Sequence, residues 1–299
     1  MENWFWLSLL SAAFYAASTI VDKINFKHHF KDSMNIFILR GFVGIIFLLV
    51  VLPVFKINLS ITTEVLYLSV LAGFCYFLAE LFYCRALFIE DSSTIAGMIQ
   101  LTPVFVAIIS FFILNERFEA YQYIGVILLT LGSTGISLRG NLDNLKISSV
   151  LKLIIPAAVL YAIFMILLEY LVRLENYITV FFYSMFFFCL FSLALCFVRF
   201  YRQNTFDLLK QNPAKPLALF ALVNLLIFGG GIFSTQALST GEVTLVSALS
   251  STFPLFVLLF SILFSVLLPA VLIEDITKST IAKKLLFILM IIFGAYLIS

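Results

Sequence analysis

The chain has 299 residues, of which 63% are hydrophobic and 11% are charged, and its formal net charge is +2. Roughly 25% of the residues of an average soluble domain are charged, so this chain has too little polar surface to be a soluble globular protein. The nearly balanced charge also predicts that the chain has no nucleic-acid partner.

Apolar runs of about 18 to 25 residues follow one another along the chain, separated by short polar breaks. About 20 apolar residues are enough for a helix to cross roughly 30 Å of hydrocarbon. Closed barrels show alternating segments of about ten residues instead, so continuous runs indicate helices. We therefore expect an all-α integral membrane protein surrounded by the lipid bilayer. Its ten predicted transmembrane helices lie at residues 4–22, 34–53, 64–88, 93–114, 120–138, 149–171, 177–198, 216–239, 243–268 and 281–298.

Two ionisable side chains lie deep in the second and third predicted spans, where a charge is costly. Arg40 lies about six residues inside the second span, and Glu80 lies about eight residues, or roughly 12 Å, before the end of the third. The second span begins at the membrane face where the third ends, so these side chains can meet. They are expected either to form an ion pair that only holds two helices together, or to serve proton coupling or recognition of substrate charge. Arg85, near the end of the third span, is a further candidate that is expected to extend to the interface.

The fourth and ninth predicted spans contain prolines, Pro103 and Pro254, which predict helix kinks. A proline removes one backbone hydrogen bond and frees a carbonyl in the preceding turn, which a membrane tolerates only against protein or a watery cavity. Side chains that form hydrogen bonds stand just ahead of both prolines: Gln100, Thr102, Ser250, Ser251 and Thr252. Each is expected either to bond to a neighbouring helix or to contact a ligand.

An internal repeat relates the two halves of the chain. A shift of 151 residues places the third and fourth predicted spans on the eighth and ninth, and a shift of 146 pairs Tyr15 with Tyr161. Identities at the first shift are Phe77 with Phe228, Phe82 with Phe233, Ala86-Leu87 with Ala237-Leu238, Pro103 with Pro254, and Phe105 with Phe256. Each unit, residues 1–140 and 141–299, holds five spans, and this odd number inverts the second unit in the membrane. Inverted repeats build many secondary transporters around a central cavity, so Tyr15 and Tyr161 are expected either to line that cavity or to bond to a neighbouring helix.

The two units differ chemically at corresponding positions. Glu80 corresponds to Gly231 in the run Gly229-Gly230-Gly231, and Arg85 corresponds to Gln236. Each glycine weakens a helix by about 1 kcal/mol relative to alanine, so the run predicts either a hinge or close packing against another helix. In the same half, Asn224 is a further candidate for ligand or helix contact, and Glu169 is expected to be solvated at the interface.

A series of short motifs in the first half resembles a known family pattern. The series is Ala86-Leu87, Pro103-Val104-Phe105, Leu114-Asn115-Glu116-Arg117, Gln122, Gly125 and Gly132. It resembles the EamA-type repeat of the drug/metabolite transporter superfamily, which reads A-L, P-V-F, G-E-R, then Q and spaced glycines. Arg40 also resembles the arginine that is usual in that family near the start of the second span. The second half keeps Gln236-Ala237-Leu238, Pro254 and Gly294 but lacks the G-E-R element.

This resemblance implies a secondary transporter that moves a small metabolite by alternating access. A polar or zwitterionic solute such as an amino acid would suit the few charges expected in the cavity, with or without proton coupling. The alternative from the same superfamily is a flippase for a lipid or a lipid-linked carrier.

Other chemistry has little support in the sequence. The chain has no G-x-x-x-x-G-K-[ST] loop for nucleotide phosphates, and no predicted span holds two aspartates or a histidine beside a nucleophile. The four cysteines lie in apolar runs without C-x-x-C spacing, and His28 and His29 are neighbours in a polar break. We expect no metal, no cofactor and no enzymatic activity.

Basic residues are distributed unevenly among the polar breaks. The breaks after odd-numbered spans carry 13 Lys and Arg, whereas the opposite face, which includes both termini, carries 3. The positive-inside rule therefore predicts a multi-pass protein of the cell membrane, plasma or inner, with both termini outside.

Overall fold

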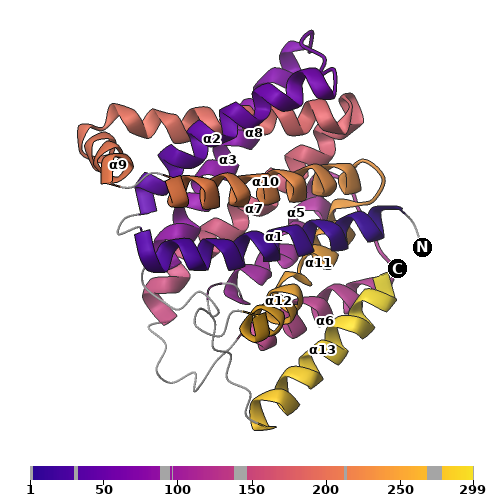
Figure 1. Ribbon diagram of the computed structural model, residues 1–299. Helices are drawn as coiled ribbons and strands as arrows, with labels where there is room; N and C mark the ends of the chain where they lie inside the picture. Colours follow the sequence, from indigo (N-terminus) through magenta and orange to yellow (C-terminus); the bar gives the residue numbers. More distant parts are fainter. Residues whose placement is uncertain are drawn as a thin grey trace.

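The computed structural model describes residues 3–29, 33–87, 95, 97–137, 147–211, 214–267 and 278–298. All regular elements in these ranges are helices (Figure 1), as the apolar runs predict. The first half contains α1 (Asn3–His29), α2 (Ser33–Val54), α3 (Thr63–Leu87), the 3-10 helix η1 (Ile99–Leu101), α5 (Thr102–Ile113) and α6 (Ala120–Ser137). The second half contains α7 (Ile147–Leu174), α8 (Tyr177–Ala194), the 3-10 helix η3 (Leu195–Phe197), α9 (Arg199–Gln211), α10 (Ala214–Leu238), α11 (Val243–Ser250), α12 (Phe253–Leu267) and α13 (Lys278–Ile298).

Seven helical segments among the described residues are long and apolar enough to cross a membrane. They are Asn3–Val21, Ile36–Val54, Thr63–Ala86, Val150–Leu174, Tyr177–Phe197, Leu217–Leu238 and Val243–Ser261, and they coincide with seven of the ten predicted spans. The fourth and tenth predicted spans fall on shorter apolar stretches, Ile99–Ile113 and Leu286–Ile298, and the fifth falls on α6. The chain is therefore a multi-pass membrane protein, and the count of ten stays a prediction.

The spans that contain Pro103 and Pro254 are interrupted at these residues, where the sequence predicts only kinks. Pro103 lies in the first turn of α5, directly after η1, and Pro254 lies in the first turn of α12, after the two-residue turn that follows α11. Proline is well tolerated in the first turn of a helix, because an N–H there has no partner within the helix.

Hydroxyl groups of α6 bond to carbonyls beside these two interruptions. Thr134 donates to the carbonyl of Gly97 at 3.2 Å, and Ser133 donates to the carbonyl of Ser251. In hydrocarbon each backbone group needs a partner, and here protein side chains supply it.

The polar break between the seventh and eighth predicted spans also contains a helix, α9. α9 lies at the end of the bundle opposite to the N- and C-termini (Figure 1) and packs against α2 and η3. The sequence predicts only a connection here, because its 13 residues are too few to cross the hydrocarbon and carry no continuous apolar run.

The longer helices pack in pairs taken from distant parts of the chain. α1 lies along α10, α3 along α7 and α6 along α13, while α2 and α3 both contact α8. Glycines permit the α6–α13 contact, since a Cβ on Gly125 would lie 2.9 Å from the carbonyl oxygen of Gly294, and the reverse distance is also 2.9 Å. Close backbone approach at small residues is a common form of helix association in membranes. These two motif glycines therefore serve packing.

Candidate functional site

A buried ion pair joins α2 to α3. Arg40 Nη1 lies 3.0 Å from Glu80 Oε2, and the two side chains are 9% and 14% exposed. The other carboxylate oxygen, Oε1, accepts a hydrogen bond of 2.6 Å from the hydroxyl of Tyr161 in α7. Glu80 is thus bound by an arginine from the first half of the chain and by a tyrosine from the second. We name these three residues the polar centre.

Aromatic rings pack beside the polar centre. The ring of Tyr76 meets Tyr161 edge-on at 5.9 Å between centroids and stacks on Phe164 at 4.7 Å. Phe188 of α8 lies 4.8 Å from Tyr76. Electrostatic interactions are stronger in such an apolar setting than in water, so these rings strengthen the contacts of Glu80.

Tyr15, the predicted repeat counterpart of Tyr161, lies against the glycine run of α10. A Cβ on Gly231 would lie 3.5 Å from the Tyr15 hydroxyl, and a Cβ on Gly230 would lie 3.4 Å from its ring. α10 continues without a break through Gly229 and the two glycines that follow. The run packs closely against α1, and its role as a hinge stays a prediction.

Two other predicted residues bond to the backbone one helical turn earlier. Thr102 donates to the carbonyl three residues earlier at 2.7 Å, and Asn224 donates to the carbonyl four residues earlier at 2.9 Å. Gln100 is buried in η1, and Gln236 is half-buried in α10. Arg85 is exposed, and its position at the membrane interface stays a prediction.

Two buried carboxylates converge on the first turn of α11. Glu116 and Glu169 are 7% and 3% exposed, and both accept a hydrogen bond from the N–H of Val243, at 3.0 and 3.1 Å. Glu116 also accepts a hydrogen bond of 2.6 Å from the hydroxyl of Thr244, which lies 2.7 Å from the hydroxyl of Ser110 in α5. We name Glu116, Glu169, Val243 and Thr244 the carboxylate latch. It ties the loop after α5 and the end of α7 to the start of α11.

The local backbone prepares both sides of this latch. N–H groups in the first turn of a helix lack helical partners, and the helix dipole favours negative charge there. Asn115, in the position where the family pattern has glycine, takes a left-handed φ of 55°, which asparagine tolerates better than most residues. The chain turns there, and the N–H of Glu116 bonds back to the carbonyl of Ser110 at 3.4 Å. Arg173, one helical turn after Glu169, forms an ion pair with it.

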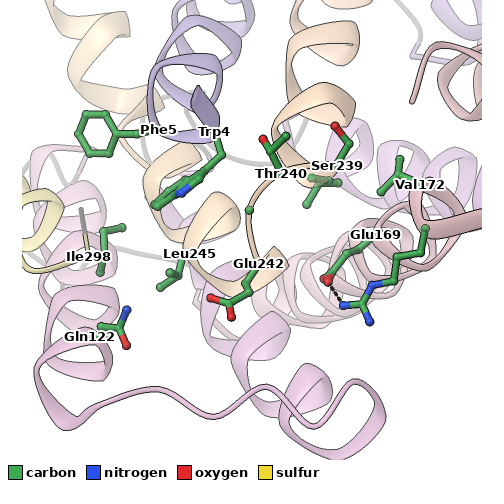
Figure 2. Close-up of a pocket in the computed structure, with 13 residues that line it drawn as sticks. Trp4, Phe5, Gln122, Glu169, Val172, Ser239, Thr240, Glu242, Leu245 and Ile298 are labelled. Carbon is green, nitrogen blue, oxygen red and sulfur yellow. Dashed lines mark hydrogen bonds and ion pairs between the residues drawn. The ribbon is translucent and has the colours of Figure 1, made fainter. Parts of the chain in front are cut away.

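A pocket of about 680 Å³ opens beside the latch, at the end of the bundle where both termini lie. Figure 2 shows Glu169 on one side of it, Trp4 and Leu245 on the other, and Glu242 between them. The indole of Trp4 packs on Gly241, where a Cβ would lie 2.5 Å from the ring. The candidate residues predicted from the sequence lie outside the lining of this pocket.

The burial of Glu169 corrects the expectation that it is solvated at the interface. A glutamate near the end of a span ordinarily reaches water, but here α11 begins beside it and supplies an N–H donor. In the sequence, Glu116 stood out only as part of a family motif. Its spacing from Val243 is 127 residues, and that of Glu169 is 74, so no local pattern predicts this contact.

The described residues contain no group of three or more His, Cys, Asp or Glu that could hold a metal ion. Cys75, Cys84 and Cys189 are buried free thiols, and Cys196 is a half-buried one. Packing among apolar neighbours is the usual role of such thiols.

Comparison with known proteins supports a transporter architecture. The EamA-like transporter family model matches residues 3–138, which confirms the resemblance carried by the motifs of the first half. One solved crystal structure is similar to this chain with a TM-score of 0.68 and 16% sequence identity, covering 98% of this chain and 95% of that one. At this identity the similarity shows the fold alone. A search of curated proteins finds no significant match.

Proposed function

We propose that this chain, whose residues 3–138 belong to the EamA-like transporter family, is a secondary transporter that moves a small polar or zwitterionic metabolite by alternating access. The family implies a membrane transporter of the drug/metabolite transporter superfamily. The polar centre carries the finer proposal, because it holds a buried carboxylate between Arg40 and Tyr161. Charged groups inside a membrane bundle are costly and typically mark the path of an ion or a substrate.

In this proposal residues 1–140 and 141–299 are inverted five-helix repeats of a ten-helix fold, with a boundary that lies outside the described residues. Helix packing supports this proposal. In the repeat α1 corresponds to α7 and α3 corresponds to α10, so exchanging corresponding helices converts the α3–α7 pair into the α10–α1 pair, and both pairs are in contact. α2 likewise contacts its counterpart α8, and α6 contacts α13. Tyr161 meets Glu80 in one pair, and Tyr15 meets Gly231 in the other. Two similar packings with different chemistry suit a protein that alternates between two states.

Glu80 is the proposed binding group for a proton or for a cationic group of the substrate. Either ligand would compete with Arg40, which lies 3.0 Å from one oxygen of the carboxylate. Loss of this ion pair would loosen the contact between α2 and α3, both of which pack against α8. Ligand binding would then favour a different helix arrangement through its differential interaction with the two states.

Two hydroxyl groups near the α11–α12 interruption are further candidates for substrate contact. The side-chain oxygens of Ser250 and Thr252 are buried and have no hydrogen-bond partner among the residues that the structure describes. A buried polar group without a partner costs about 1–3 kcal/mol, which a hydrogen bond to substrate would recover.

The carboxylate latch is the proposed closure of the face that carries the termini. Glu116 comes from the first repeat, whereas Glu169 and the start of α11 come from the second. Glu169 follows Tyr161 by eight residues on α7, so the latch lies about 12 Å from the polar centre along that helix. Opening of the latch would connect the pocket of about 680 Å³ to the interior. The distribution of basic residues predicts that this face is outside, and a reporter fused after Ser299 that is active in the cytoplasm would contradict that orientation.

Purified protein in liposomes that contain a pH-sensitive dye tests the proposal. Amino acids, sugars, nucleotides and cationic drugs are added in turn, and one class is expected to evoke proton movement that Glu80→Gln abolishes when equal amounts of folded protein are reconstituted. Normal transport by this variant would remove Glu80 from the mechanism. If no class moves protons, counterflow of labelled solutes distinguishes an electroneutral exchanger or facilitator from an inactive protein.

A pair of tyrosines provides a matched test in the same liposomes. Tyr161→Phe removes one hydrogen bond to a charged group, worth about 1.5–3 kcal/mol, so transport should fall roughly 10- to 100-fold. Tyr170 forms the corresponding bond between the same two helices at the surface, with its hydroxyl 3.2 Å from Glu64. Tyr170→Phe should therefore leave the transport rate unchanged.

An apolar groove between α5 and α6 favours a second candidate, a flippase for a lipid or a lipid-linked carrier. The groove has a volume of about 330 Å³, and its lining includes Ile108 and Phe112, which are exposed on the outer surface of the bundle. A groove open to the side suits an acyl chain better than a water-soluble solute. Dithionite bleaching of a fluorescent lipid in the same liposomes measures flipping. Transport of an amino acid by protein that does not move the lipid would exclude this candidate.

A further inference from the structure

α9 and Phe197, the last residue of η3, present aromatic and basic side chains to the surroundings. Phe197 is 89% exposed and Phe200 is 63% exposed, and Phe206 is also exposed. Arg199 and Arg202 stand beside these phenylalanines and are exposed as well. Neither arginine forms an ion pair with any residue that the structure describes.

The opposite side of α9 is attached to the protein. Thr205 is buried and its hydroxyl donates to the carbonyl of Tyr201 at 2.9 Å, while the Tyr201 ring is half-buried. Residues four apart share a helix face, so these two define the side that packs on α2. Arg199, Arg202 and Phe206 lie on the other side, which therefore points away from the bundle.

The position of α9 places that outer side at a bilayer surface. The helix joins the ends of two candidate membrane spans, Tyr177–Phe197 and Leu217–Leu238. Figure 1 shows it beyond the ends of α8 and α10, at the pole remote from the termini. Its 13 residues extend over roughly 20 Å, which is too short to cross the hydrocarbon. This is also the face that the distribution of basic residues predicts to be cytoplasmic.

We propose that α9 is an interfacial helix that binds anionic phospholipid headgroups through Arg199 and Arg202, while Phe197 and Phe200 enter the acyl boundary of the same leaflet. Exposed phenylalanines alternating with arginines match the two layers of such an interface. Charge selects an anionic lipid, because residues 199–216 contain four basic residues and one acidic residue. The proposal requires only that the chain spans a bilayer, so it stands or falls independently of transport.

Native mass spectrometry of lipid retention tests the charge contribution. Purified protein is mixed with equal amounts of phosphatidylglycerol and phosphatidylcholine, and it is expected to retain phosphatidylglycerol preferentially. Each basic residue near an anionic surface contributes roughly five-fold to affinity, so Arg199→Gln with Arg202→Gln should lower phosphatidylglycerol retention roughly 25-fold and leave phosphatidylcholine unchanged. The matched control, Lys56→Gln with Arg117→Gln, removes two exposed charges from the opposite face and should behave like wild type. Unchanged retention in the α9 variant, or an equal loss in the control, would overturn the proposal.

A nitroxide label tests the insertion of α9 into the interface. The label is attached at Phe200→Cys, in protein whose Cys196 is replaced by serine, and the comparison site is Ser60→Cys in the exposed loop after α2. In phosphatidylglycerol bilayers the Phe200 label should collide with oxygen more often than with a water-soluble nickel complex, relative to the Ser60 label. Equal accessibility of both labels to nickel would show that α9 lies in water, or against a soluble partner, and would overturn lipid insertion.

Discussion

Replacing Glu80 by glutamine distinguishes an ion pair used in transport from one that only holds two helices together. The variant keeps the shape of the side chain and an oxygen that can accept the bond from Tyr161, but it removes the charge 3.0 Å from Arg40. Since the two side chains of the pair are only 9% and 14% exposed, water does little to replace the lost partner. Loss of one partner of a buried pair costs about 3–5 kcal/mol, and the remaining hydrogen bond places Glu80→Gln near the lower end, at about 3 kcal/mol.

The double variant Arg40→Gln with Glu80→Gln removes both charges, so no unpaired charge is left buried. Replacing a buried pair by well-packed apolar side chains is often neutral for stability. Two glutamines carry no charge and can hydrogen-bond to each other, so the double variant should lie within about 1 kcal/mol of wild type. The double variant should therefore be about 2–3 kcal/mol more stable than Glu80→Gln alone, a non-additivity expected for residues in direct contact.

Thermal unfolding in detergent measures the stability of these variants, and solute uptake into liposomes measures transport. If Glu80 binds a proton or a cationic substrate group, the double variant is stable and yet inactive. Glu64→Gln, an exposed glutamate on the same helix, serves as the control and should change neither quantity. Recovery of both stability and transport in the double variant would reduce the Arg40–Glu80 pair to a structural contact and refute the proposed role of Glu80.

Three further predictions follow from the latch, the unpartnered hydroxyls and the helix crossings. Glu116→Gln weakens the hydrogen bonds of the carboxylate latch by about 1.5–3 kcal/mol, so the latch should open more often. Labelling by a water-soluble maleimide at Ser247→Cys, which is buried in α11, should then rise at least roughly ten-fold. Unchanged labelling would argue against opening of the latch. Thr252→Val should lower substrate affinity without loss of stability, because its hydroxyl has no partner among the described residues. The control Thr235→Val loses a hydrogen bond of 2.8 Å and should destabilise the protein. A destabilised Thr252→Val would show that the Thr252 hydroxyl has a structural partner. Gly294→Ala would place a Cβ 2.9 Å from a carbonyl oxygen of α6, so the unfolding free energy should fall by about 1–3 kcal/mol, and an unchanged melting temperature would contradict the tight α6–α13 crossing.

Much of the fold class and part of the polar centre follow from the sequence without any structure. Long apolar runs require a membrane, because no soluble arrangement could cover them. The depths of Arg40 and Glu80 follow from the helical rise, and the opposite directions of successive spans bring the two side chains to the same level. The structure joins them at 3.0 Å for that reason. The predicted repeat register, which pairs Tyr15 with Tyr161, rests only on sequence identities.

The carboxylate latch, the interruptions at the prolines and the placement of α9 depended on the packing of distant segments. Glu169 has the local sequence of a solvated residue, and it becomes buried because α11, which begins 74 residues later, presents an N–H to it. Pro103 permits either a kink or a new helix start, and η1 before it settles the choice. Hydrophobic length and proline chemistry act locally and can be predicted from the residues themselves. The partner of a buried polar group is selected by whichever segment the folded bundle brings within hydrogen-bonding distance.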